Sequence, residues 1–184
     1  MSRRYPPRAA VALALLASSG SALAGPHQEL GKAEGRCRPG ESGPALIVTA
    51  IGLKDRAGAL KLEVYPANDS DFLQDDKILV AQGKTFRRVE VPVPAGAEPS
   101  LCIRVPAPGR YAVSLLHDRD ANHKFNLSGD GIGFPGNHRL GWAKPKAAAS
   151  SAVAGPGLTQ VPIVLNYRQG LLAFGPLDRR RARR

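Results

Sequence analysis

The stretch Leu60-Lys61-Leu62-Glu63-Val64-Tyr65 alternates aliphatic side chains with side chains that carry a polar end. A period of two places the three aliphatic residues on one face of a β-strand and the other three on the opposite face. The stretch therefore predicts a half-buried strand. Residues 85–93 alternate in the same way, and Pro92 has no backbone N–H to donate, which predicts an edge strand.

Short strand-like stretches continue along the chain on both sides. Residues 46–51 are mostly apolar and β-branched, which predicts a well-buried strand that forms a hairpin with residues 60–65. Residues 77–80 fit a short strand or a helical turn. Further strands are predicted at residues 101–105, 111–116, 161–167 and 171–174.

About seven short strands with no convincing amphipathic helix predict an all-β chain, folded as an antiparallel β-sandwich. A small barrel is the alternative. The 20 glycines, the 16 prolines and the low aromatic content fit short strands joined by many turns. Residues 118–157 have no clear periodicity and predict one long loop, a kind of segment that is usually functional or mobile.

The chain divides into four predicted segments. Residues 1–24 have the form of a signal peptide, with early arginines, an apolar run of about nine residues and a small-x-small cleavage site. An uncleaved membrane anchor is the alternative, but the run is short for a membrane span. Residues 25–44 are predicted to be an irregular arm, 45–177 the sandwich domain and 178–184 a basic, disordered tail. We therefore expect a periplasmic or secreted protein with no transmembrane segment after cleavage.

The formal net charge of +11 is concentrated at the two ends of the chain. Arg3, Arg4 and Arg8 lie in the predicted signal peptide, and the tail at 178–184 carries five arginines and one aspartate. Such a tail can bind an anionic envelope surface, although a solvated, mobile end is the alternative. Export argues against a nucleic-acid partner. An unknown envelope component or ligand is the expected partner.

Cys37 and Cys102 are the two cysteines of the chain. In an oxidising compartment an isolated pair usually forms a disulfide. The bond would tie the arm to a strand in the middle of the chain, with a stabilisation of about 4 kcal/mol as an upper figure. Two buried free thiols are the alternative.

The run His117-Asp118-Arg119-Asp120-Ala121-Asn122-His123-Lys124-Phe125-Asn126 places oxygen-bearing side chains at alternate positions after a strand. Calcium loops present their oxygen ligands with this spacing. The candidate ligands are Asp118, Asp120, Asn122, the Lys124 carbonyl, Asn126 and the later Asp130. His123 stands where a glycine is expected, so we expect at most a weak site, with a Kd of about 10⁻⁴–10⁻³ M. The alternative is a loop whose side chains bond its own backbone.

Other side chains near this loop are candidates for ligand binding. His117, Phe134 and Trp142 are predicted to form a sugar-binding or peptide-binding rim at residues 117–142. Alternatively, Trp142 folds onto the core, and His117 orders the loop through hydrogen bonds. A transition metal held by His117, His123 and His138 is a further alternative, because imidazole suits Zn²⁺ or Cu²⁺.

Catalytic motifs with a known mechanism are absent from the sequence, including G-x-S-x-G, H-E-x-x-H and the P-loop. A non-enzymatic binding module is therefore the expected function. One alternative is a metal-dependent hydrolase that uses His117, Asp118 and Asp120. Another is a structural protein associated with the envelope.

Three features in order resemble a known family: Pro108-Gly109-Arg110-Tyr111-Ala112-Val113, then His117-Asp118 with its Asp/Asn loop, then Gly131-Ile132-Gly133-Phe134. Together they are similar to the bacterial exported proteins of the domain of unknown function 2141, over roughly residues 46–167. The resemblance implies a sandwich of the immunoglobulin-like or transthyretin-like type and no established activity.

The loop departs from the pattern of that family at several positions. Asp120 stands where asparagine is usual, Ala121 and His123 replace glycines, and Asn126 replaces an acid. The segment after the loop is shortened to Gly131-Ile132-Gly133-Phe134-Pro135. These changes make a metal role of this loop less secure than in a chain that keeps the pattern.

Overall fold

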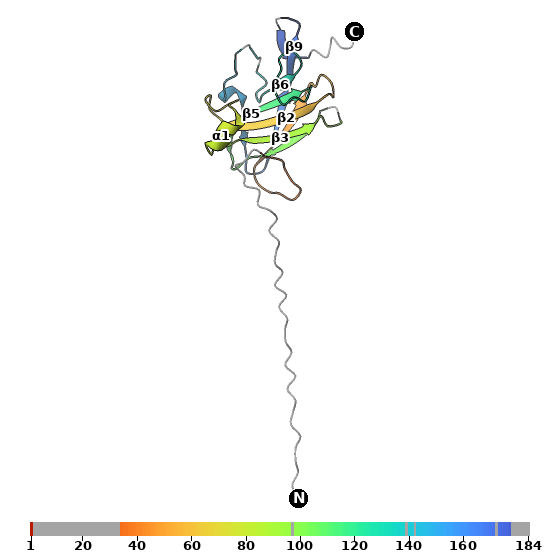
Figure 1. The fold of residues 1–184 in the computed structure, drawn as a ribbon. Helices are drawn as coiled ribbons and strands as arrows, with labels where there is room; N and C mark the ends of the chain where they lie inside the picture. Colours follow the sequence, from red (N-terminus) through yellow and green to blue (C-terminus); the bar gives the residue numbers. More distant parts are fainter. Residues whose placement is uncertain (2–33, 97, 139, 142, 172, 178–184) are drawn as a thin grey trace.

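The computed structural model describes Met1 and residues 34–177, apart from 97, 139, 142 and 172. The predicted signal peptide after Met1, the basic tail and Trp142 lie outside the described residues. Two sheets make up most of the fold (Figure 1). The smaller sheet has the order β4 (Ser100–Arg104), β1 (Ala45–Ile51), β8 (Leu158–Val164). The larger has the order β10 (Ala173–Pro176), β9 (Asn166–Gln169), β6 (Gly131–Gly133), β5 (Gly109–Asp118), β2 (Ala59–Pro66), β3 (Arg87–Pro92), and β7 (Ser151–Ala154) also pairs with β5.

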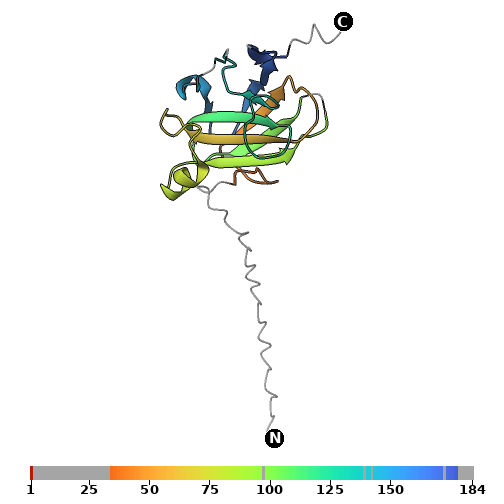
Figure 2. The same ribbon diagram turned by 45° about the horizontal axis from the view of Figure 1, so that its top comes forward.

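The two sheets enclose an apolar core, which confirms the predicted all-β sandwich. Leu60, Leu62 and Val64 of β2 face this core together with Val113 and Leu115 of β5. Figure 2 shows β2, β3 and β5 lying side by side in the larger sheet. All pairs are antiparallel except β1 and β8, which run parallel.

The outer face of β2 is also buried, so the expectation of a half-buried strand was wrong. Lys61, Glu63 and Tyr65 point away from the core, and each is less than one tenth exposed. The segment that directly follows β2 and the loop after β5 lie over them. Alternation therefore identified the strand correctly but gave no information on what lies over its polar face.

The predicted hairpin between residues 46–51 and 60–65 was also wrong. β1 is the central strand of the smaller sheet, whereas β2 lies in the larger one, so the connection at 52–58 crosses between the layers. The edge position predicted for residues 85–93 is confirmed, because β3 ends the larger sheet. The predicted strand at 161–167 is divided between β8 and β9, which belong to different sheets.

The stretch at 77–80 belongs to a short helix, α1 (Asp76–Ala81), whose first turn is capped when the Asp75 carboxylate accepts from the amide of Lys77 at 2.9 Å. The expected long loop contains β6, a 3₁₀ turn η1 (Ala148–Ser150) and β7. β6 and β7 have only three and four residues, which is too short to show a period in sequence.

Cys37 and Cys102 form the predicted disulfide, which ties the segment before β1 to β4. No helix in the described part of the chain is long and apolar enough to cross a membrane.

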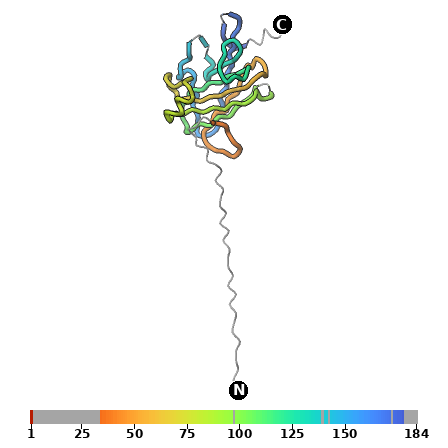
Figure 3. Tube along the Cα trace, in the orientation of Figure 1, coloured from red at the N-terminus to blue at the C-terminus, as the bar shows by residue number. Residues whose placement is uncertain are grey.

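Two segments cover opposite ends of the outer face of β2 and β5. Residues 66–86, here called the α1 end, follow β2 and include α1. Residues 118–130, here called the loop end, follow β5. Because Ala59 pairs with Asp118 and Pro66 with Tyr111, the two segments leave the sheet at opposite ends. Figure 3 shows the α1 end on one side of the sheet and the turn before β2 on the other.

Candidate functional site

His117 and Asp118 are neighbours at the end of β5, so their side chains point to opposite faces of the sheet. His117 points inwards and is completely buried. Its Nε2 lies 2.9 Å from the carbonyl oxygen of Ala57, and its Nδ1 lies 2.7 Å from the hydroxyl of Tyr167. A carbonyl only accepts, so Nε2 carries the hydrogen and Nδ1 accepts from Tyr167. Both ring nitrogens are therefore engaged in holding β5 to the turn before β2 and to β9.

The ionisation of this buried pair follows from its surroundings. Burial lowers the pKa of His117, which favours the neutral ring that accepts from Tyr167. Burial also raises the pKa of Tyr167 to about 12, and its hydroxyl accepts from the amide of Lys54 at 3.2 Å. This placement agrees with the alternative interpretation of His117 as a residue that orders the loop.

Asp118 points to the outer face and is completely buried. Its Oδ2 accepts from the amide of His123 at 2.7 Å, and its Oδ1 accepts from the amide of Asn122 at 3.2 Å. Ala121 and His123 have positive φ values of 53° and 65°. The loop therefore makes its left-handed turns without glycine at these positions, helped by the hydrogen bonds to Asp118.

Asp130 closes the other side of the loop. Its Oδ1 accepts from the amide of Arg119 at 2.9 Å and its Oδ2 from the amide of Asn126 at 2.8 Å. The guanidinium of Arg119 donates to the Gly129 carbonyl at 3.0 Å and from Nε to Oδ2 of Asp55 at 2.9 Å. The hydrogen bond from Arg119 lowers the pKa of Asp55. The loop is thus fastened to the turn before β2.

The remaining candidate calcium ligands also bond within the loop. The side-chain oxygen of Asn122 accepts from the amide of Lys124 at 2.8 Å, and that of Asn126 accepts from the amide of Ser128 at 3.0 Å. Exposed Asp120 accepts from the side chain of Asn122 at 2.8 Å. The self-bonded loop that the sequence left as an alternative is therefore present.

Three of the candidate ligands nevertheless converge. Asp118, Asp120 and Asp130 each offer a carboxylate oxygen, and these oxygens lie within 4.8 Å of one another. A second group of described residues, Glu90, Asp118 and His123, meets the same distance limit. Neither group contains His117.

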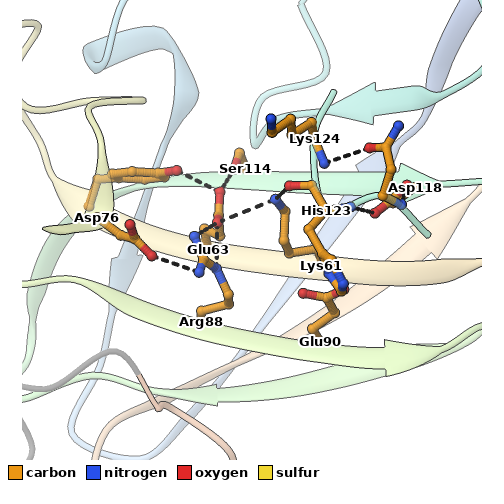
Figure 4. Close-up of polar contacts among 11 residues, drawn as sticks. Lys61, Glu63, Asp76, Arg88, Glu90, Ser114, Asp118, His123 and Lys124 are labelled. Carbon is orange, nitrogen blue, oxygen red and sulfur yellow. Dashed lines mark hydrogen bonds and ion pairs between the residues drawn. The ribbon is translucent and has the colours of Figure 1, made fainter. Parts of the chain in front are cut away.

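Glu90 is a residue that sequence reasoning missed. It lies on β3, and its Oε1 is 2.7 Å from Nδ1 of His123 (Figure 4). Nothing in the spacing of the sequence connects the two residues, which are 33 positions apart. The only available indication was that Glu90 occupies a polar position of an alternating strand.

Paired charges fill the outer face beside this group (Figure 4). Lys61 donates from Nζ to the carbonyl of His123 at 2.7 Å. Glu63 accepts from Nε of Arg88 at 2.8 Å and from the hydroxyl of Tyr65 at 2.6 Å. The polar ends of buried Lys61, Glu63 and Tyr65 therefore each have a hydrogen-bond partner, as buried polar groups require.

An apolar cavity of about 280 Å³ lies against the loop end. Phe125 and Leu127 of the loop contribute to its wall, and both are partly exposed. Phe134, a predicted ligand-binding residue, also lines the cavity, although it is nearly buried and packs edge-on against Phe72. Lys144 lies at the same wall.

Comparison with known proteins gives one match. No curated protein matches the chain, and no solved structure matches it. Residues 48–161 match the model of a bacterial family described as an uncharacterized protein conserved in bacteria, DUF2141. This range contains the last four residues of β1, all of β2, β3, β5 and β6, and the whole loop end. The chain therefore belongs to the DUF2141 family, as its sequence motifs predicted.

Proposed function

We propose that this protein is an exported, non-enzymatic binding module whose ligand face is the 117–142 segment. Ca²⁺ held by Asp118, Asp120 and Asp130 sets the conformation of that segment. The convergence of these three carboxylates, with oxygens within 4.8 Å of one another, is the observation that carries the proposal. Hard cations such as Ca²⁺ are bound by oxygen ligands of this kind.

The hydrogen bonds within the loop leave capacity for an ion. A carboxylate offers about four lone-pair sites. Asp118 and Asp130 each accept two backbone amides, and Asp120 accepts from Asn122. Two of the three carboxylates are buried, so bringing the third towards them without a cation is unfavourable. Backbone carbonyls and water would complete the six to eight ligands of Ca²⁺.

The loop connects the carboxylates to the apolar cavity. Phe125 and Leu127 lie in sequence between Asp120 and Asp130, and they form part of the cavity wall. An ion that fixes the carboxylates would therefore also fix these two side chains. Apolar cavities with a few polar groups at the rim are the usual form of ligand sites.

The hydrolase alternative has less support from the geometry. A hydrolase using His117, Asp118 and Asp120 needs the imidazole free and beside the carboxylates. His117 instead lies on the opposite face of β5, with both ring nitrogens hydrogen bonded. Activity screens with added Zn²⁺ or Mn²⁺ test this alternative directly, and turnover lost in Asp118→Ala would favour it.

The calcium part of the proposal is tested by thermal unfolding in 5 mM Ca²⁺ and in EDTA. For a Kd of about 10⁻⁴–10⁻³ M we expect a stabilisation of about 1–2 kcal/mol, or about 3–6 °C in Tm. Asp120→Asn should lose most of the shift, because it removes one of the three negative charges that attract the ion. The fold should stay intact, because Asp120 is exposed. Glu98→Gln, an exposed acid in the β3–β4 connection, is the matched control and should keep it. An equal shift in wild type and Asp120→Asn would contradict the proposal.

Export of the protein and binding of its tail to the envelope are tested by separate experiments. The full chain expressed in a bacterium should yield a periplasmic product that begins at residue 25. If the protein is instead a structural component held by its tail, membrane association should be sensitive to salt and should disappear when residues 179–184 are deleted.

A further inference from the structure

We propose that Glu90, Asp118 and His123 form a second metal site, suited to Zn²⁺ or a similar divalent transition-metal ion. The site goes beyond the proposed calcium function, because its ligand set and its strand are different. Only Asp118 is common to the two groups.

The three side chains come from two parts of the chain that the fold brings together. Glu90 lies on the edge strand β3, and His123 lies in the loop after β5. One ligand atom of each residue lies within 4.8 Å of the others, and Nδ1 of His123 is 2.7 Å from Oε1 of Glu90. In Figure 4 the side chain of His123 extends from the loop towards Glu90.

The separations suit a small ion after a minor adjustment. Tetrahedral Zn²⁺ with bonds of about 2.0–2.1 Å places its ligand atoms about 3.4 Å apart. Two of the atoms are already closer than this, and the third lies within 4.8 Å of them, so it needs a movement of at most about 1.4 Å. His123 can supply that movement because its side chain is 71% exposed. Asp118 is held in place by the two loop amides.

The donor set distinguishes this site from the calcium group. One imidazole and two carboxylates match Zn²⁺, Co²⁺ or Mn²⁺, whereas Ca²⁺ takes oxygen ligands. The two carboxylates balance the charge of the ion. Lys61 is a neighbouring positive charge, and its Nζ already donates to the His123 carbonyl and lies 3.9 Å from Glu63.

The fourth coordination position faces solvent. A surface depression of about 390 Å³ is lined by Glu90 and His123 together with Gly58 and Ala121. Three protein ligands with one open position leave room for water or for a donor atom of a bound ligand.

Titration with Co²⁺, followed by visible absorption and by calorimetry, tests the site without any assay of activity. Wild-type protein should bind one Co²⁺ per chain, and Zn²⁺ should displace it. Glu90→Gln and His123→Asn should each weaken the Kd by at least about tenfold. Asparagine is the chosen replacement for His123 because it tolerates the φ of 65° at this position.

Two control variants make the result decisive. His138→Asn removes an exposed histidine outside the group and should leave Co²⁺ binding unchanged. Asp120→Asn should also leave it unchanged while reducing the effect of Ca²⁺, so the failure of one proposal is distinguishable from the failure of the other. Absence of Co²⁺ binding by wild type would overturn the proposal. Binding that is equal in wild type, Glu90→Gln and His123→Asn, or that depends on His138, would overturn it as well.

Discussion

The two ends of the outer face are held by different forces. At the α1 end, Tyr65, Phe72, Leu79 and Phe86 are buried together, with ring centroids 5.6 Å apart between Tyr65 and Phe72 and 5.3 Å apart between Tyr65 and Phe86. Apolar contacts of this kind depend little on ions or pH. The packing at the α1 end should therefore contribute to the free energy of unfolding under most conditions, whether or not an ion is bound.

At the loop end, hydrogen bonds take the place of apolar packing. Asp118 and Asp130 each accept two backbone amides, while Phe125 is 44% exposed and Leu127 is also partly exposed. A segment with few buried apolar contacts opens at low cost in free energy. The difference indicates that the conformation of the loop end, rather than that of the α1 end, can respond to a bound ion or ligand.

The largest expected effect lies at the α1 end. Phe72→Ala removes a fully buried ring and should cost about 3–5 kcal/mol in the free energy of unfolding, measured by urea denaturation. The matched change at the loop end, Phe125→Ala, should cost about 1 kcal/mol or less. Equal losses would mean that the loop end is also held by apolar packing.

His117→Leu should have the next largest effect. It leaves the buried Tyr167 hydroxyl without its acceptor and the Ala57 carbonyl, at a part-buried contact, without its donor. We expect a loss of about 2–3 kcal/mol in thermal or urea unfolding. His138→Leu, at an exposed histidine, should change stability by about 0.5 kcal/mol or less. A near-neutral His117→Leu would show that the buried ring does not hold the strand end.

Asp130→Asn tests the hydrogen bonds that close the loop. An amide keeps one acceptor and presents an N–H₂ group to a backbone donor, so a loss of about 1–2 kcal/mol is expected in the absence of Ca²⁺. Asp120→Asn should be nearly neutral under the same conditions, because Asp120 is exposed. The difference between the two losses in free energy of unfolding measures how much the buried carboxylate of Asp130 stabilises the loop when no ion is bound.

The smallest expected effect is a pH dependence at the α1 end. The hydrogen bond from Lys84, at 2.6 Å, and that from Asn68 lower the pKa of Asp71. A carboxyl with a lowered pKa stabilises the fold above its unfolded pKa of about 4, and this contribution disappears as the pH falls through the folded pKa. We expect at most about 1 kcal/mol. Between pH 7 and pH 3, the free energy of unfolding should decline less steeply in Asp71→Asn than in wild type. Identical pH profiles would contradict this role of Asp71.

Local patterns were enough to predict much of the fold. Alternation at 60–65 and 85–93 identified β2 and the edge strand β3, and the isolated cysteine pair identified the disulfide. The hairpin prediction failed because β1 is apolar on both faces and its two partners, β4 and β8, come from much later in the chain. Pairing between distant strands leaves no local mark in the sequence.

The site was predictable in its residue types and less so in its geometry. The loop carboxylates converge as their spacing suggested, but Glu90 joins them from a strand that no loop motif includes. The position of His117 at the end of a strand indicated a hydrogen-bonding role, but its partner Tyr167 lies 50 residues later. Both Glu90 and Tyr167 reach the site through contacts between residues far apart in the sequence, and local sequence patterns do not show such contacts.

Hydrogen–deuterium exchange of the two ends, compared in Ca²⁺ and in EDTA, tests the central claim most directly. We expect the amides of Arg119, Asn122, His123 and Asn126 to exchange about tenfold more slowly in Ca²⁺, because the ion fixes the carboxylates that accept from them. Amides of the α1 end should show no change. Exchange that is unaffected by Ca²⁺ at the loop end, or slowed equally at both ends, would contradict the account.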